Sequence, residues 1–330
     1  MSIRSQGEME WLVLLFSYRD SAFFLFSFNC PFSSYKVLTM ATRTIKQGFD
    51  VFHTRITPGS YEPGKASSHK ASITRRLEEY YDLNRLVYSG SANSGTDVNY
   101  LSDVDFFASI PTKKLKKNSS TSLREIKECL QGRYPNTTIY VDSPAIVLGF
   151  GSGVWDTAEV IPADYIKQID GKNVYDVPNG DGEWMRSSPR THSDYVTSEN
   201  VRLNRKLKPL IRMLKAWKYY CNVPISSFYL ELRATKWMES ETSIIYDIDL
   251  KTILKKLTDV ELAAIQDPKG ISGYVYASPS SSKKADALSK LNTAKNRAIK
   301  AREAESSGNT KDAFYWWDKV FGGSFPSYYY

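Results

Sequence analysis

The sequence has little cysteine and little histidine. Its 330 residues include three of each, and neither set has the spacing of a disulfide framework, a zinc site or a histidine-based triad. The cysteines lie far apart and are odd in number: Cys30, Cys129 and Cys221. We therefore predict a reducing compartment, the cytoplasm, and find no basis in the sequence for a disulfide-stapled scaffold or a zinc-centred enzyme.

Long apolar runs are also missing. A membrane-spanning helix needs ~20 apolar residues in a row, and the two apolar runs of residues 1–39 are split by Arg19 and Asp20. Acidic residues stand where a signal peptide would carry positive charge. The sequence from Met40 onward reads like the start of a soluble domain. We therefore expect residues 1–39 to be an N-terminal extension outside the fold, and we expect no membrane partner.

Acidic residues are in mild deficit. The formal net charge is +8 and the pI is about 9.1. A basic excess suits a partner rich in phosphate, such as a nucleotide or a nucleic acid. This excess is smaller than a dedicated duplex binder would carry, so we expect no stable nucleic-acid partner.

The most informative stretch runs from Leu86 to Ile110. An apolar run enters a turn at Ser89-Gly90-Ser91, a polar loop follows over residues 92–102, and Asp103-Val104-Asp105 opens a second strand. Side chains alternate along a strand, so the two aspartates share one face. Carboxylates roughly 6–7 Å apart can share divalent metal ions, and the Gly/Ser turn can approach a phosphate closely.

The remainder reads as a mixed α/β half followed by an all-helical half, with a boundary near residue 195. Residues 59–66 are a near miss to a phosphate-binding P-loop and are predicted to be a loop, because Ala66 lacks the hydroxyl that such a loop needs. We predict a strand at residues 158–163 and a loop over residues 174–190. A helix with one basic face is predicted over residues 199–220, bent at Pro209.

Four patterns stand in order and carry a resemblance. They are Gly90-Ser91 with Asp103-Val104-Asp105, Glu159-Val160-Ile161-Pro162-Ala163, Ile211-Arg212-Met213-Leu214-Lys215-Ala216-Trp217-Lys218, and Val320-Phe321-Gly322-Gly323-Ser324-Phe325-Pro326. Together they resemble the cGAS/DncV-like nucleotidyltransferases of the DNA polymerase β-like superfamily, the CD-NTases of CBASS anti-phage systems. The resemblance implies an α+β fold: a polymerase β-like palm with a mixed sheet and flanking helices at residues 40–195, and an all-helical C-terminal lobe at residues 196–330.

The resemblance also implies an activity. Such enzymes join nucleoside triphosphates, ATP, GTP or others, into a cyclic di- or trinucleotide and release pyrophosphate. The product is a second messenger that a separate effector reads, and accessory CBASS proteins can control its synthesis.

Site residues follow from the same resemblance. Asp103, Asp105 and a third carboxylate, Glu159, are expected to hold two Mg²⁺ or Mn²⁺ ions. Glu159 departs from the aspartate of the family pattern, and its longer side chain loosens the geometry that Mg²⁺ demands. Asp156 and Asp164 are the alternatives for this third position.

The family's triphosphate contacts map onto four residues. Gly90 and Ser91 would hold the triphosphate, and Lys215 and Ser227 would grip its β- and γ-phosphates. The competing interpretations are a structural lysine for Lys215 and a helix N-cap for Ser227.

Other functions share parts of this pattern. A nucleotidyltransferase that makes a linear oligonucleotide or tails RNA would use the same three carboxylates. A catalytically silent nucleotide-binding module would be expected to have lost one of them. A toxin that transfers a nucleotide to a protein or a tRNA would need a macromolecular acceptor.

Overall fold

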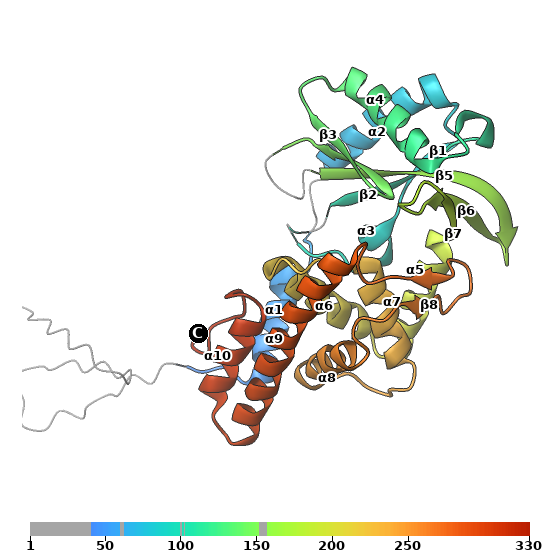
Figure 1. The fold of residues 1–330 in the computed structure, drawn as a ribbon. Helices are drawn as coiled ribbons and strands as arrows, with labels where there is room; N and C mark the ends of the chain where they lie inside the picture. Colours follow the sequence, from blue (N-terminus) through green and yellow to red (C-terminus); the bar gives the residue numbers. More distant parts are fainter. Residues whose placement is uncertain (1–40, 60–62, 100, 102, 152–156) are drawn as a thin grey trace, which may run out of the picture. The chain divides into compact units, whose positions relative to one another are not determined.

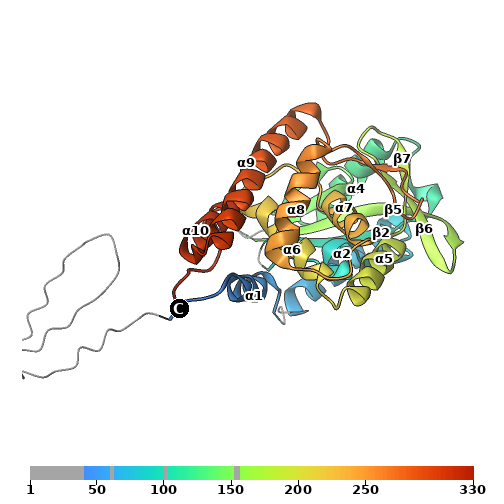
Figure 2. The ribbon, with the colours of Figure 1, turned by 90° about the horizontal axis from the view of Figure 1, so that it is seen from below.

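The computed structural model describes residues 41–59, 63–99, 101, 103–151 and 157–330. Arg43 to Tyr328 form one compact unit. The expectation for residues 1–39 and the alternative site residue Asp156 lie outside the described residues, so both stay predictions. Figures 1 and 2 show the ribbon in two views.

The elements alternate in the first half of the chain and are mostly helical in the second. The helices are α1 Ile45–Ile56, α2 Pro63–Tyr81, α3 Gly90–Ser94, the 3-10 turn η1 Thr112–Lys114, α4 Ser119–Arg133, α5 Pro189–Arg202, α6 Leu207–Tyr220, α7 Ser227–Met238, α8 Tyr246–Asp259, α9 Ser281–Ser306 and α10 Thr310–Val320. The strands are β1 Arg85–Tyr88, β2 Val104–Ser109, β3 Thr138–Asp142, β4 Ala145–Gly149, β5 Thr157–Ile169, β6 Lys172–Pro178, β7 Trp184–Ser187, β8 Ile265–Gln266 and β9 Tyr274–Val275.

A mixed sheet of seven strands forms the first half, as predicted. Its order is β1-β2-β5-β4-β3, with β6 beside β5 and β7 beside β6; β2 and β5 are parallel and the other neighbours are antiparallel. One face is covered by α2 and α4 (Figure 1) and buries alternate residues such as Phe106, Ile146 and Val160. The intervening residues of these strands therefore point to the opposite face.

The second core belongs to the helices and is dominated by large aromatic side chains. Trp217 of α6, Trp317 of α10 and Phe321 are fully buried, together with Phe49 and Phe52 of α1. Helices α9 and α10 lie side by side in both views (Figures 1 and 2). Helix α1, although it comes from the other end of the described chain, packs against α6, α8 and α10.

The loop predicted over residues 174–190 is wrong. Strands β6 and β7 form a hairpin there, with Asp176 paired with Arg186, and its turn holds Gly180 and Gly182 at φ of +99° and +86°. Buried Val174, Tyr175 and Val177 anchor β6. The prediction gave weight to the glycines of the turn and missed the short strands on either side.

The single helix predicted over residues 199–220 is two helices. Asn204 and Arg205 have φ of +52° and +62°, a conformation that a right-handed helix cannot include, so α5 ends at Arg202 and α6 begins at Leu207. Pro209 is the third residue of α6, where a backbone N–H has no partner within the helix. The predicted bend is therefore absent.

The loop predicted over residues 59–66 is also partly wrong. Helix α2 begins at Pro63, because proline suits the first turn of a helix, where its missing N–H would have no partner. Residues 60–62 lie outside the described chain.

Candidate active site

Two of the predicted carboxylates are direct neighbours across the sheet. The parallel register of β2 and β5 pairs Asp105 with Glu159, and Asp103 comes immediately before β2. The side chain of Glu159 lies close enough to those of Asp103 and Asp105 for both to raise its pKa. The three residues predicted as a carboxylate triad therefore lie together on the sheet face opposite α2 and α4.

The electrostatics of this cluster follow from burial and like charge. Burial raises the pKa of Asp105, and the negative charge of Asp103 raises it further. The pKa of Glu159 is raised for the same reasons, burial first and Asp103 next. Three carboxyl groups at this spacing cannot all be ionised cheaply unless a cation is present.

The Gly/Ser turn packs directly on Asp105. Gly90 has φ of +57°, and a Cβ atom added there would lie 1.7 Å from Asp105 Oδ2. The Ser91 N–H donates to the same oxygen at 3.3 Å, and the Ser89 N–H donates to the Asp105 backbone oxygen at 2.9 Å. Because of the positive φ and the contact with Asp105, only glycine fits at position 90. The loop predicted from residue 92 begins instead as part of the short helix α3.

A hydroxyl next to Asp105 has no partner. Ser89 is 1% exposed, and its Oγ makes no hydrogen bond within the described structure. Continuing the antiparallel register of β1 with β2 places Ser89 opposite Asp105. A buried hydroxyl without a partner is costly, and a ligand bound over the carboxylates could satisfy it.

The donor set fits a hard divalent cation. Carboxylate oxygens are the ligands that Mg²⁺ prefers, and bound positive charge would relieve the repulsion that raises the pKa values of Asp105 and Glu159. Among the described residues, no three His, Cys, Asp or Glu side chains stand in the arrangement of a metal site. The raised pKa values of Asp105 and Glu159 mean that metal binding would have to displace protons from the cluster.

The alternative third carboxylate, Asp164, has another partner. Its Oδ1 accepts a hydrogen bond from Thr112 Oγ1 at 2.8 Å, and it pairs with Asp176 across β5 and β6. Glu159 is thus the described carboxylate that sits beside Asp105.

Lys215 lies inside the protein. Its side chain is 1% exposed, and its Nζ donates to Glu231 Oε1 of α7 and, at 2.9 Å, to Thr96 Oγ1. The predicted phosphate contact of Lys215 is not tested by this geometry, but it would have to compete with a buried ion pair.

Lys218, one turn further along α6, is within electrostatic reach of the carboxylates. Burial and the charge of Lys215 lower its pKa, while the charges of Asp103, Glu159 and Asp105 raise it. Its Nζ donates to Ser227 Oγ at 2.7 Å. From the sequence, Lys218 was one of the basic residues of this helix and had no assigned role, because spacing alone does not distinguish positions i and i+3 of one face.

Ser227 is not the N-cap of its helix. Ser226 caps α7, since its Oγ accepts a hydrogen bond from the Tyr229 N–H at 3.3 Å. The Ser227 hydroxyl is therefore free of the capping role and holds Lys218 instead.

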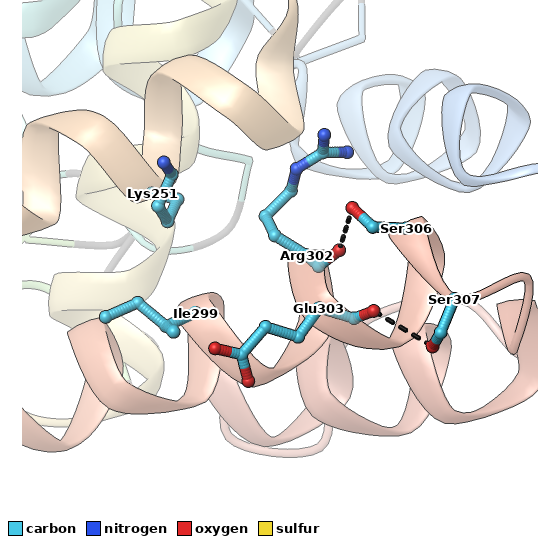
Figure 3. Close-up of a pocket in the computed structure, with 6 residues that line it drawn as sticks. All are labelled: Lys251, Ile299, Arg302, Glu303, Ser306 and Ser307. Carbon is cyan, nitrogen blue, oxygen red and sulfur yellow. Dashed lines mark hydrogen bonds between the residues drawn. The ribbon is translucent and has the colours of Figure 1, made fainter.

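A surface pocket of about 610 Å³ lies elsewhere, on the helical lobe (Figure 3). It is lined by Lys251, Ile299, Arg302, Glu303, Ser306 and Ser307. Arg302 is paired with Asp247 and Glu305. The pocket contains none of the predicted site residues.

In the described part of the chain, no helix is long and apolar enough to cross a membrane.

Comparison with known proteins relates this chain to a described domain family. Residues 43–200 match the model of the Second Messenger Oligonucleotide or Dinucleotide Synthetase domain. A probable cyclic nucleotide synthase of Bacillus cereus (strain VD146) is 26% identical over 278 residues, which cover 80% of this chain and 82% of the relative.

Solved structures share the fold. Escherichia coli MS115-1 CdnC with ATP aligns at a TM-score of 0.65 and 18% identity, over 86% of this chain and 99% of CdnC. The Vibrio cholerae DncV cyclic AMP-GMP synthase, in complex with a linear intermediate, aligns at a TM-score of 0.67 and 13% identity, over 88% of this chain and 98% of DncV. The predicted α+β architecture is confirmed.

Proposed function

Because the chain belongs to the CD-NTases, with a Second Messenger Oligonucleotide or Dinucleotide Synthetase domain at residues 43–200, we propose that it makes a cyclic nucleotide messenger. The enzyme is a nucleotidyltransferase that joins nucleoside triphosphates into a cyclic di- or trinucleotide and releases pyrophosphate. The messenger serves anti-phage defence and is read by a separate effector.

One observation carries this proposal: a cluster of three carboxylates lies within electrostatic reach of Lys218, a cation on α6. Asp105 and Glu159 are register partners with Asp103 beside them. Lys218, held by Ser227, is within electrostatic reach of all three. Negative groups that bind metal and a positive group that binds phosphate are the two requirements for activating a triphosphate.

Two Mg²⁺ or Mn²⁺ ions, when bound, supply charge neutralisation and activation of the attacking oxygen. Asp103 and Asp105 would hold both ions, and Glu159 would hold mainly the ion near the attacking hydroxyl. That hydroxyl oxygen forms a bond to the α-phosphorus while the bond between the α-phosphorus and the bridging oxygen breaks. Pyrophosphate leaves, and the hydroxyl proton is lost to the carboxylate cluster.

Residues around the carboxylate cluster would orient the triphosphate. Gly90 and Ser91 form the first turn of α3 and already direct one N–H at the cluster. Lys218 with Ser227 is the pair we place on the β- and γ-phosphates. Lys215, predicted for this role from the sequence, would support the site through Thr96 and Glu231.

Partners and location remain proposals of the same kind. A CdnC structure in complex with a HORMA protein is among the similar folds, so we propose that an accessory protein controls this enzyme as well. Nucleoside triphosphates are cytoplasmic metabolites, and we propose the cytoplasm as the site of action.

The decisive experiment is a product assay. The full chain is incubated with four labelled ribonucleoside triphosphates and Mg²⁺ or Mn²⁺, treated with phosphatase and resolved by mass spectrometry. A phosphatase-resistant product without terminal phosphates, absent for the Asp103→Asn/Asp105→Asn variant, is expected. A ladder of linear oligomers would replace the cyclase by a polymerase, and transfer only to an added protein or tRNA would indicate a toxin.

A further inference from the structure

One row of side chains crosses the active face of the sheet. The register pairs Asp105 with Glu159, Glu159 with Val147, and Val147 with Tyr140. Directly paired residues project to the same side. Tyr140 on the edge strand β3 therefore shares a face with the carboxylates, two strands beyond Glu159, or about 10 Å away at the usual strand spacing.

The two ends of this row differ in what they offer a nucleotide. At the Asp105 end lies the Gly90 turn, which packs directly on that carboxylate and is placed on the phosphates. In-line attack brings the acceptor hydroxyl from the side opposite the leaving pyrophosphate. The acceptor nucleoside must then lie on the Glu159 side of Asp105, toward β4 and β3.

Tyr140 is built to receive an aromatic ring at that end. It is 50% exposed, although its neighbour in the row, Val147, is 3% exposed. Partial burial raises the pKa of the Tyr140 hydroxyl, and the charges of Asp142, Glu159 and Asp103 raise it further. This agrees with the position that the strand register gives Tyr140. Tyr140 is thus an exposed aromatic side chain on an edge strand, with one apolar residue between it and the carboxylates in the row.

We infer that Tyr140 is the platform on which the base of the acceptor nucleotide stacks while its ribose hydroxyl reaches the carboxylates at Glu159. This rests on the proposed nucleotidyl transfer and adds to it the position of the second nucleotide. Stacking on a tyrosine tolerates any base, because every base has a π face. Tyr140 thus sets the affinity for the acceptor, and Asp142 beside it on the same strand face is placed to read the base edge.

Kinetics of matched variants test the assignment. Tyr140→Thr removes the ring and keeps a residue that favours strands, Tyr140→Phe keeps the ring, and Tyr165→Ala removes a tyrosine of similar exposure (44%) from the far half of β5. Stacked bases contribute enough that Tyr140→Thr should raise KM about tenfold or more. Its kcat should stay near that of wild type, and Tyr140→Phe and Tyr165→Ala should resemble wild type.

Each outcome decides something. If wild type makes a product and Tyr140→Thr has the KM of Tyr165→Ala, the inference is overturned while the proposed function stands. If wild type makes no product with any nucleotide, the proposed function fails and the inference fails with it. Thermal unfolding checks the fold of each variant, and Tyr140→Leu replaces Tyr140→Thr if the latter is unfolded.

Discussion

Asp105 is the residue on which the site converges. Its carboxylate touches the Gly90 turn, accepts from the Ser91 N–H, and lies beside Glu159 on the next strand. It is also within reach of the Lys215 charge, which lowers the pKa that burial and Asp103 raise. A small displacement of Asp105 would disturb both the carboxylate cluster and the Gly90 turn.

Gly90 provides a sharp test of this contact. Gly90→Ala places a Cβ atom 1.7 Å from Asp105 Oδ2 and also strains a φ of +57°. Gly171→Ala strains a φ of +71° with nothing within 4 Å, so both variants carry the left-handed penalty of roughly 1–2 kcal/mol. We expect Gly90→Ala to lose messenger synthesis and Gly171→Ala to keep it. Equal activity of the two folded variants would contradict the contact.

His53 gives a pH dependence whose direction can be stated. Burial and the charge of Arg212 lower its pKa from the usual 6.5, against a smaller raising effect of Asp50. The unfolded chain then binds more protons at His53 than the folded chain does, so stability rises with pH. The contribution is complete above about pH 6.5, the unfolded value, and is lost as the pH falls through the lower folded value.

His53→Gln removes this titration and keeps an acceptor for Arg212, whose Nη1 lies 3.2 Å from His53 Nε2. Urea unfolding between about pH 7 and about pH 5 should therefore show a shallower loss of stability for the variant than for wild type. Parallel curves would mean that the folded protein does not hold His53 neutral.

At the scale of elements, α6 turns its basic residues inward. Arg212 donates to the backbone oxygens of Gly95 and Asp97, each at 2.8 Å, and Lys215 donates to the Thr96 side chain between them. Gly95, Thr96 and Asp97 directly follow α3 in the sequence. Through these hydrogen bonds, α6 holds the segment that follows the Gly90 turn.

Lys215 and Lys218 should separate stability from activity. Lys215→Met leaves Glu231 buried without its partner, at a cost of roughly 3–5 kcal/mol in the free energy of unfolding. Lys218→Met should keep the stability near that of wild type. It should raise KM for the nucleotide roughly 10- to 100-fold, the range of a charged hydrogen bond to phosphate.

Urea unfolding and messenger synthesis are the two measurements. Lys255→Met, which breaks an exposed pair with Asp259, is the control and should change the stability by less than about 1 kcal/mol. Wild-type kinetics for a folded Lys218→Met would remove Lys218 from the site.

At the scale of the whole molecule, one compact unit from Arg43 to Tyr328 holds both the sheet and the helical core. Helix α1 precedes the sheet in the sequence but adds Phe49 and Phe52 to the helical core. The helical core therefore contains residues from before and after the sheet. The predicted boundary near residue 195 stays a proposal, and α5 runs through it.

A chain that begins at Met40 tests the expectation for residues 1–39. Since the domain match begins at residue 43, we expect messenger synthesis equal to that of the full chain and a melting temperature within about 2 °C of it. A loss of either would assign residues 1–39 to the working enzyme.

The sequence alone was sufficient for the fold class, and its assignment of the catalytic carboxylates stays a prediction. Alternation along a strand is local, so the residue order by itself assigns Asp103 and Asp105 to one face. The β6–β7 hairpin and the break between α5 and α6 were missed because short strands and left-handed residues such as Asn204 leave weak local signals.

Only the tertiary structure shows what the basic residues of α6 contact. Lys215 and Lys218 are one turn apart and chemically alike, and both are within electrostatic reach of the carboxylates. What separates them is the hydrogen-bond partner: Glu231 and Thr96 bind the first, and Ser227 binds the second. The register that aligns Tyr140 with Glu159 is likewise invisible in the chain. Pairing between strands depends on contacts far apart in sequence, whereas a strand's own alternation does not.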